Sequence, residues 1–111
     1  MKAQTAVAAL AALAQTNRLA IFRLLVQRGP EGLCVGDIAA KFDLANATLS
    51  FHLKELQSSG LITAMQQGRF IYYAANFSAM NRLLDYLTDH CCAGGSCEVT
   101  RVKPQCAEVA T

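Results

Sequence analysis

A change of hydrophobic period in the second half of the chain constrains the fold more than any other feature of the sequence. Before residue 60 the apolar residues recur at helical spacing, as in Leu49, Leu53 and Leu56, which lie at i, i+4 and i+7. Residues 61–75 instead contain two short runs, LITAM and RFIYYAA, that are rich in strand-favouring residues. Gly68 lies in the connection between them. The segment therefore predicts a β-hairpin within a helical protein.

Helical patterns occupy most of the remaining sequence, and Gly or Pro residues mark several of the expected ends. The last helix is expected to continue into the adjacent cysteines, because the glycine pair at 94 and 95 is the first strong stop signal after it. The predicted helices span about residues 3–15, 18–28, 35–42 and 46–59 before the hairpin, and 77–92 after it.

Side-chain caps and apolar stripes can be assigned to these helices. We expect the second helix to be capped by Thr16 or Asn17, the third near Asp37, and the last by Asn76 or Ser78. The expected apolar stripes are Val7, Leu10 and Leu13 in the first helix, Leu19, Phe22 and Val26 in the second, Ile38 and Phe42 in the third, and Met80, Leu83, Leu84 and Leu87 in the last.

The order helix, helix, short helix, helix, hairpin, helix is that of a winged helix-turn-helix, whose short helix and following helix dock on DNA. We therefore predict a mainly α fold with a β-hairpin, comprising a DNA-binding and dimerisation domain over residues 1–92 and a tail over 93–111. A net charge of +2 excludes a strongly basic nucleic-acid coat but permits a small basic patch. Apolar residues make up 53% of the chain and charged residues 16%, which favours an apolar subunit interface.

The N-terminal segment has some features of a signal peptide, since Lys2 precedes an Ala/Leu-rich stretch. Gln4, Thr5 and Gln15 interrupt that stretch, and it runs into an amphipathic pattern, so a helix of the mature protein is the favoured interpretation. No run approaches the ~18 apolar residues of a membrane span. We expect a cytoplasmic protein, whose five cysteines would serve as ligands or reactive thiols rather than disulfides.

Three ordered segments carry a family resemblance: QTNRLAIFRLLVQRGPEGLCVGDIAAKF, LSFHLKELQSSGLI and GRFIYYA. Together, over residues 8–90, the chain resembles the ArsR/SmtB family of metalloregulatory repressors. The resemblance implies a homodimer that releases operator DNA when a metal or metalloid ion binds. It also implies that the first and last helices form the dimer interface.

The expected recognition helix would present to the major groove the face opposite its leucine stripe. Thr48 and Ser50 could bond phosphates or base edges, and Lys54 suits a phosphate. Phe51 would contact a thymine methyl group or be partly buried. Asn46 has two open interpretations, as a DNA contact or as the helix cap.

Two further positions are assigned through the resemblance. His52 corresponds to the histidine of the family pattern S-x-H-L and is expected to act as a structural hydrogen-bonding group or a phosphate contact rather than a metal ligand. Arg69 corresponds to the arginine of the family's wing, which reaches the minor groove, with a solvated hairpin charge as the alternative. Gln66 and Gln67 stand where related wings often have basic residues, which predicts a shallow salt dependence of binding.

Two ion sites of the family are incomplete in this sequence. Cys34 corresponds to the first cysteine of the pattern E-L-C-V-C-D-L, but Gly36 replaces the second, so one thiol remains and it is expected to be a small buried residue. The last helix offers Asp85, Asp89 and His90, but lacks the paired histidines of a zinc site.

The stretch TDHCCAGGSCEVT leaves a third candidate, because it places Cys91, Cys92 and Cys97 within seven residues. Adjacent cysteines rarely pair with each other, whereas three thiolates suit arsenic(III) or antimony(III), which favour three sulfur ligands. Structural zinc prefers four ligands and would have to recruit His90 or Cys106. If helical, Cys91 extends the last apolar stripe, which would couple ion binding to the dimer interface.

The sequence thus predicts a DNA-binding transcriptional repressor that releases its operator when arsenite or antimonite occupies this three-cysteine site. Three alternatives keep the scaffold: another effector ion (zinc, cadmium or copper(I)), a methylated arsenical, or a thiol redox switch. A small thiol enzyme or metal chaperone is disfavoured, because the sequence has no C-x-x-C pair and no nucleophile–base signature.

Overall fold

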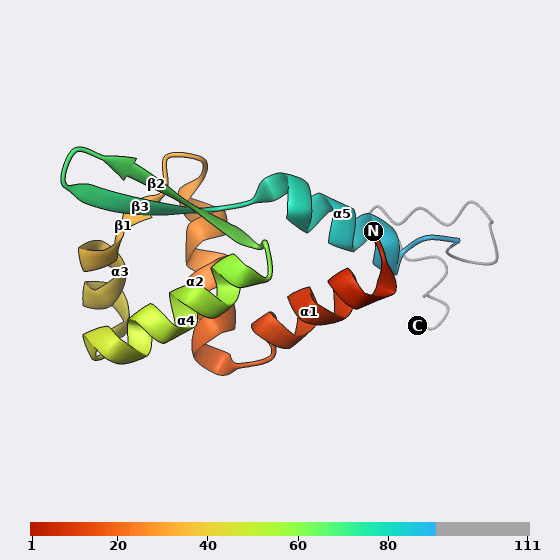
Figure 1. Cartoon of the computed structure of the whole chain (residues 1–111), viewed down its shortest axis with the longest axis horizontal. Helices are drawn as coiled ribbons and strands as arrows, with labels where there is room; N and C mark the ends of the chain where they lie inside the picture. The colour runs from red at the N-terminus through yellow and green to blue at the C-terminus, as the bar shows by residue number, and fades with distance from the viewer. Residues whose placement is uncertain (91–111) are drawn as a thin grey trace, which may run out of the picture.

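The computed structural model describes residues 1–90 and confirms the predicted winged helix-turn-helix (Figure 1). Five helices and a three-stranded antiparallel sheet make up this part of the chain. In chain order the elements are α1 (Ala3–Leu13), α2 (Thr16–Arg28), β1 (Leu33–Cys34), α3 (Val35–Phe42), α4 (Asn46–Ser58), β2 (Ile62–Gln67), β3 (Phe70–Ala75) and α5 (Phe77–Leu87).

The sheet has the strand order β1-β3-β2, and the hairpin β2–β3 forms its larger part. Ile62 pairs with Ala75 and Gln67 with Phe70, so Gly68 and Arg69 alone make the turn. The short strand β1 was not predicted: Leu33 pairs with Tyr73 and Cys34 with Tyr72 on the free edge of β3. Two residues are too few to show an alternating pattern, and their pairing depends on a strand almost forty residues away.

The core lies between α2, α4 and the sheet. The predicted α4 stripe of Leu49, Leu53 and Leu56 is confirmed, since each of these side chains is at most 2% exposed. In α2 the prediction was partly wrong: Phe22 is buried but Leu19 is 44% exposed. The largest fully buried side chains are Ile21, Leu25, Ile38, Leu49, Leu53, Leu56, Leu61 and Ile62.

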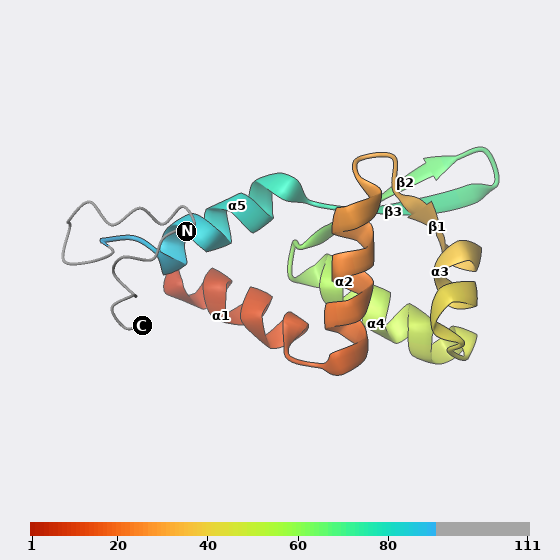
Figure 2. The same ribbon diagram turned by 180° about the vertical axis from the view of Figure 1, so that it is seen from behind.

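Helices α1 and α5 lie side by side at one end of the molecule, and α3 and the tip of the hairpin lie at the opposite end (Figures 1 and 2). Helix α1 packs through its alanines at positions 6, 9 and 12, so Val7 and Leu10 of the expected stripe are 64% and 42% exposed. Leu83 of α5 is buried, but Leu84 and Leu87 are 52% and 53% exposed. Helix α1 therefore buries alanines and α5 buries Ala79 and Leu83, while Val7, Leu10, Leu84 and Leu87 stay exposed.

The helix starts differ from the sequence prediction at several positions. Gln15, rather than Thr16 or Asn17, caps α2. Neither α3 nor α4 has a side-chain cap: Asp37 lies in the first turn of α3, and Ala45 rather than Asn46 is the cap residue of α4. Asn76 caps α5, in agreement with one of the two predicted candidates, by accepting a hydrogen bond from the backbone N–H of Ala79 at 3.1 Å.

Helix α5 is shorter than predicted and ends at Leu87. The hydroxyl of Thr88 donates to the carbonyl oxygen of Leu84 at 2.9 Å, and His90 has a left-handed backbone with φ +60°. The expectation that helical phase continues to Cys91 is therefore wrong, because the chain leaves the helix before that residue. Taken singly, none of the described helices is long and apolar enough to cross a membrane; α1 and α2 reach that threshold only together, with a 101° bend between them.

Candidate nucleic-acid interface

Helices α3 and α4 form the helix-turn-helix, and a sharp turn separates them. Asp43 adopts a left-handed conformation with φ 52°, and its N–H donates to the carbonyl oxygen of Ala39 at 2.9 Å, which ends α3. Asp residues tolerate this conformation better than most others. Leu44 then packs partly against the core, so that α4 begins with one face buried and one face outside.

The outward face of α4 contains most of the residues that the sequence assigns to DNA. Thr48 and Ser50 are exposed near its beginning, and Lys54 lies one turn beyond Ser50. Phe51 is 54% exposed, so about half of its side-chain surface is accessible from this face. Asn46 is exposed and does not cap the helix. The exposed set is Asn46, Ala47, Thr48, Ser50, Phe51 and Lys54.

His52 lies apart from this set, on the buried face of α4, where it is 6% exposed. Its Nδ1 lies 3.4 Å from Nη1 of Arg18 in α2. Because a guanidinium can only donate, Nδ1 accepts and the ring proton of the neutral form resides on Nε2. Burial, and secondarily the Arg18 charge, lower the pKa of His52 below 6.5. This burial and the contact with Arg18 are consistent with the structural hydrogen-bonding role, one of the two roles expected for His52.

Arg18 is a residue that sequence reasoning missed. Besides its contact with His52, its Nε donates to the carbonyl oxygen of Ala12 at 2.7 Å. A signal was present, because Arg18 occupies the first turn of α2, where the helix dipole disfavours a cation. Such a residue is expected to have a partner outside its own helix.

The hairpin turn forms the wing. Gly68 has φ +65°, a value suited to glycine in a two-residue turn, and Arg69 beside it is exposed. Gln66 and Gln67 are exposed as well, so Arg69 is the cation of this turn. Phe70 is 60% exposed, an aromatic side chain at the wing that the sequence analysis did not single out.

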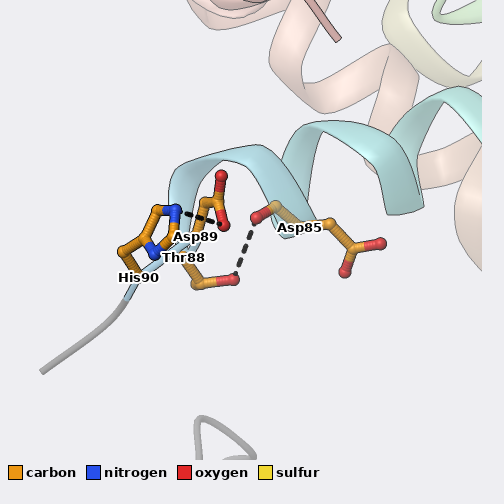
Figure 3. Close-up of polar contacts among 4 residues, drawn as sticks. All are labelled: Asp85, Thr88, Asp89 and His90. Carbon is orange, nitrogen blue, oxygen red and sulfur yellow. Dashed lines mark hydrogen bonds and ion pairs between the residues drawn. The ribbon is translucent and has the colours of Figure 1, made fainter. Parts of the chain in front are cut away.

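Within residues 1–90 no three His, Cys, Asp or Glu side chains converge in a way that could hold a metal ion. Cys34 is half-buried at the end of β1, as a free thiol. At the end of α5, His90 Nε2 lies 3.6 Å from an Asp89 carboxylate oxygen, while the Asp85 carboxylate points away from both (Figure 3). Cys91, Cys92 and Cys97 lie outside the described residues.

Comparison with protein families and curated proteins identifies a helix-turn-helix family and several related proteins. A family described as a helix-turn-helix domain matches residues 13–63. The arsenical resistance operon repressor of Bacillus subtilis is 40% identical over 81 residues, which is 73% of each chain. The nodulation protein NolR of Rhizobium meliloti is 33% identical over 87 residues, covering 78% of this chain and 69% of NolR.

Solved structures give the same result for the fold. A crystal structure described as an ArsR family transcriptional regulator superposes with a TM-score of 0.69 at 27% identity, covering 81% of this chain and 90% of that one. HlyU from Vibrio cholerae has a TM-score of 0.61 at 29% identity, with 78% of this chain and 97% of HlyU covered.

Proposed function

Because the chain belongs to the ArsR family of helix-turn-helix transcriptional regulators, we propose that it is a homodimeric repressor that releases operator DNA when arsenic(III) or antimony(III) binds. The observation that carries the DNA-binding part is the two-sided character of α4. Leu49, Leu53 and Leu56 fix one face in the core, while the opposite face presents Thr48, Ser50, Phe51 and Lys54 to solvent.

DNA recognition would use two elements. Helix α4 enters the major groove, where Thr48 and Ser50 bond base edges or phosphates and Phe51 contacts a thymine methyl group. Lys54 contacts a phosphate, and Arg69 of the wing reaches the adjacent minor groove. Asn46, exposed at the start of α4, joins this surface. His52 supports α4 from its buried face, through the contact with Arg18, rather than by touching DNA.

The homodimer interface is proposed on the surface formed by α1 and α5. Val7, Leu10, Leu84 and Leu87 are between 42% and 64% exposed on these two adjacent helices. Large apolar side chains exposed on two neighbouring helices favour an interaction surface there, and a two-fold dimer would bury them against their own copies. A Leu84→Glu variant should sediment as a monomer, while wild-type protein sediments as a dimer. Equal sedimentation of both would overturn the interface.

The effector site is proposed at Cys91, Cys92 and Cys97, the first of which lies four residues after the end of α5 in the sequence. The donor chemistry supports this choice, since three soft thiolates suit a three-coordinate metalloid ion. Two relatives also support it: the arsenical resistance operon repressors of Bacillus subtilis and Escherichia coli are 40% and 38% identical to the chain over the aligned residues. Binding would act on DNA affinity through α5, provided the ion has different affinities for the DNA-binding and released states.

Fluorescence anisotropy of a labelled duplex tests the proposal. The duplex is selected from a random library by the wild-type protein, and the complex is titrated with arsenite, antimonite, zinc and cadmium under reducing conditions. We expect arsenite and antimonite to release DNA from the wild type but not from Cys91→Ser, Cys92→Ser or Cys97→Ser. Cys34→Ser is the matched control and should respond as the wild type does, because Cys34 lies on the edge of the sheet.

Two outcomes would reject the arsenic assignment. If zinc or cadmium dissolves the complex while arsenite leaves it intact, the same scaffold senses a different thiophilic ion. If peroxide releases DNA and a reductant restores binding, the cysteines form a redox switch. Failure of the wild type to select any duplex would instead reject DNA binding itself.

A further inference from the structure

One guanidinium group connects three helices of the winged-helix unit. Arg18 in α2 donates from Nε to the carbonyl oxygen of Ala12 in α1 at 2.7 Å, and its Nη1 lies 3.4 Å from Nδ1 of His52 in α4. We infer that Arg18 and His52 are a positioning pair that sets the orientation of α4 against the end of α1, and thereby the affinity for DNA. This inference rests on the proposed use of α4 as the recognition helix.

The Ala12 end of the contact meets a need of α1. The last carbonyl groups of a helix lack partners within the helix and carry partial negative charge. Helix α1 has no basic residue in its last turn, so the charge of Arg18 from the next helix compensates its C-terminal end. The hydrogen bond from Nε to Ala12 restricts the orientation of the guanidinium plane, and thereby the direction in which Nη1 points toward α4.

Apolar packing alone does not account for a histidine at position 52. His52 lies between Leu49 and Leu56 on the buried face of α4, where a leucine would pack without needing a hydrogen bond. A buried imidazole nitrogen requires a partner, and leaving it unpaired is costly. The contact therefore requires a rotational setting of α4 that keeps Nδ1 of His52 near Nη1 of Arg18, a directional requirement that apolar packing by the leucine stripe does not itself impose.

The rotational setting of α4 determines where the side chains on its DNA-facing side lie. Phe51 is the neighbour of His52, and the two rings are 5.7 Å apart between centroids and tilted by 57°. A rotation of α4 that breaks the Arg18–His52 contact moves Phe51, Ser50 and Lys54 relative to the wing. Arg18 thus controls the recognition surface without belonging to it.

Protonation of His52 provides a way to break the contact, because imidazolium and guanidinium can both only donate. The charged groups around His52 offer little compensation. Helix α1 and strands β2 and β3 contain no charged residue. From α4 itself Glu55 is exposed, and it lines the same open cavity of about 400 Å³ as Arg18. The remaining charged side chains of α2, α3 and α4 are exposed: Arg23, Arg28, Asp37, Lys41 and Lys54.

The first test separates positioning from phosphate contact. Affinity for the selected duplex is measured by anisotropy over a series of salt concentrations. Arg18→Met should bind roughly tenfold more weakly, because a hydrogen bond to a charged group is lost, with the salt slope of the wild type. Lys54→Ala is the comparison variant, and it should lower the slope by about one because it removes a phosphate contact.

The second test uses pH and does not depend on the folding of Arg18→Met. Asparagine places an acceptor near the position of Nδ1 and does not titrate, so His52→Asn should bind as the wild type does at about pH 7.5. As the pH falls from 6.5 through the lowered pKa of His52, the wild type should lose affinity severalfold more than His52→Asn does. The chain has two histidines, and His90 is present in both proteins, so it cancels in the comparison.

The inference is overturned if Arg18→Met binds with wild-type affinity, or if it lowers the salt slope as Lys54→Ala does. It is equally overturned if His52→Asn follows the pH profile of the wild type. These failures differ from failure of the proposed function, in which the wild type itself would bind no selected duplex.

Discussion

The side-chain amide of Asn76 donates a hydrogen bond to the carbonyl oxygen of Gly60, with 3.0 Å between Nδ2 and the oxygen. The same side chain caps α5 through Oδ1, which accepts from the N–H of Ala79. Gly60 lies in the turn after α4, where it has φ +83°. One asparagine therefore joins the end of the recognition helix to the beginning of α5.

Asn76→Ala should lower the free energy of unfolding by about 1–3 kcal/mol, because it removes both the cap and the bond to Gly60. Asn76→Ser is the matched variant: a serine can cap the helix, but it is too short to reach Gly60. Its stability should lie between those of the wild type and Asn76→Ala in urea denaturation. An alanine variant with the wild-type midpoint would contradict this account.

Alanine substitutions at Phe51 and Leu53 of α4 should have opposite effects: the first on DNA binding, the second on stability. Phe51→Ala should weaken DNA binding and leave the urea midpoint nearly unchanged, since Phe51 is 54% exposed. Leu53 is 2% exposed, and Leu53→Ala should cost about 2–5 kcal/mol of stability by creating a cavity. Anisotropy and urea denaturation on both variants check the prediction, which is wrong if Phe51→Ala is as destabilised as Leu53→Ala.

Gly32 and Gly36 form a second matched pair. Gly32 has φ +75°, and an added Cβ would lie 2.6 Å from the backbone oxygen of Tyr73. Gly32→Ala should therefore destabilise by more than the ~1–2 kcal/mol of the left-handed conformation alone. Gly36 lies within α3 with nothing within 4 Å of an added Cβ, so Gly36→Ala should stabilise by up to about 1 kcal/mol. Thermal unfolding of both variants should give shifts in Tm of opposite sign.

The lowered pKa of His52 makes stability depend on pH in a defined direction. Burial and the Arg18 charge keep the folded-state pKa of His52 below 6.5, the ordinary value expected in the unfolded chain. As the pH falls below 6.5, the unfolded chain takes up a proton that the folded chain does not. The contribution is therefore present above pH 6.5 and is lost as the pH falls to the folded-state pKa. Urea denaturation at several pH values should show this loss in the wild type and a flatter profile in His52→Asn.

Positive charge added to the wing should change both the affinity for DNA and its dependence on salt. Gln66 and Gln67 are exposed beside Arg69, so Gln66→Lys and Gln67→Lys together should tighten binding at low salt. Each new phosphate contact should steepen the slope of log affinity against log salt by about 0.9. Arg69→Ala should weaken binding instead. An unchanged salt slope in the double lysine variant would show that the wing does not approach the phosphates.

The sequence was sufficient to predict those parts of the fold that depend on local pattern. The spacing of Leu49, Leu53 and Leu56 predicted α4 and its buried face, and the change of period predicted the hairpin. Cap positions were less certain, because Gln15 and Ala45 are not preferred capping residues. The stop of α5 at Leu87 was missed because Thr88 and His90 are weaker terminators than the glycines beyond them.

Features that depend on distant contacts could not be predicted. Strand β1 exists because Leu33 and Cys34 meet the free edge of β3. The Arg18–His52 contact joins residues 34 positions apart, and no local pattern connects them. Helical spacing identified the apolar stripes of the first and last helices, but it could not show that α1 would pack through its alanines and leave Val7 and Leu10 exposed.

The short strand β1 has a mechanical consequence. Cys34 is both its last residue and the cap residue of α3, so the start of α3 is tied to the wing through Tyr72. The helix-turn-helix is therefore joined to the hairpin at two places, through the chain connection from α4 to β2 and through the backbone pairing of β1 with β3. Two single side chains link this unit to the helices at the other end of the molecule: Arg18 bonds the end of α1, and Asn76 bonds both Gly60 and the start of α5.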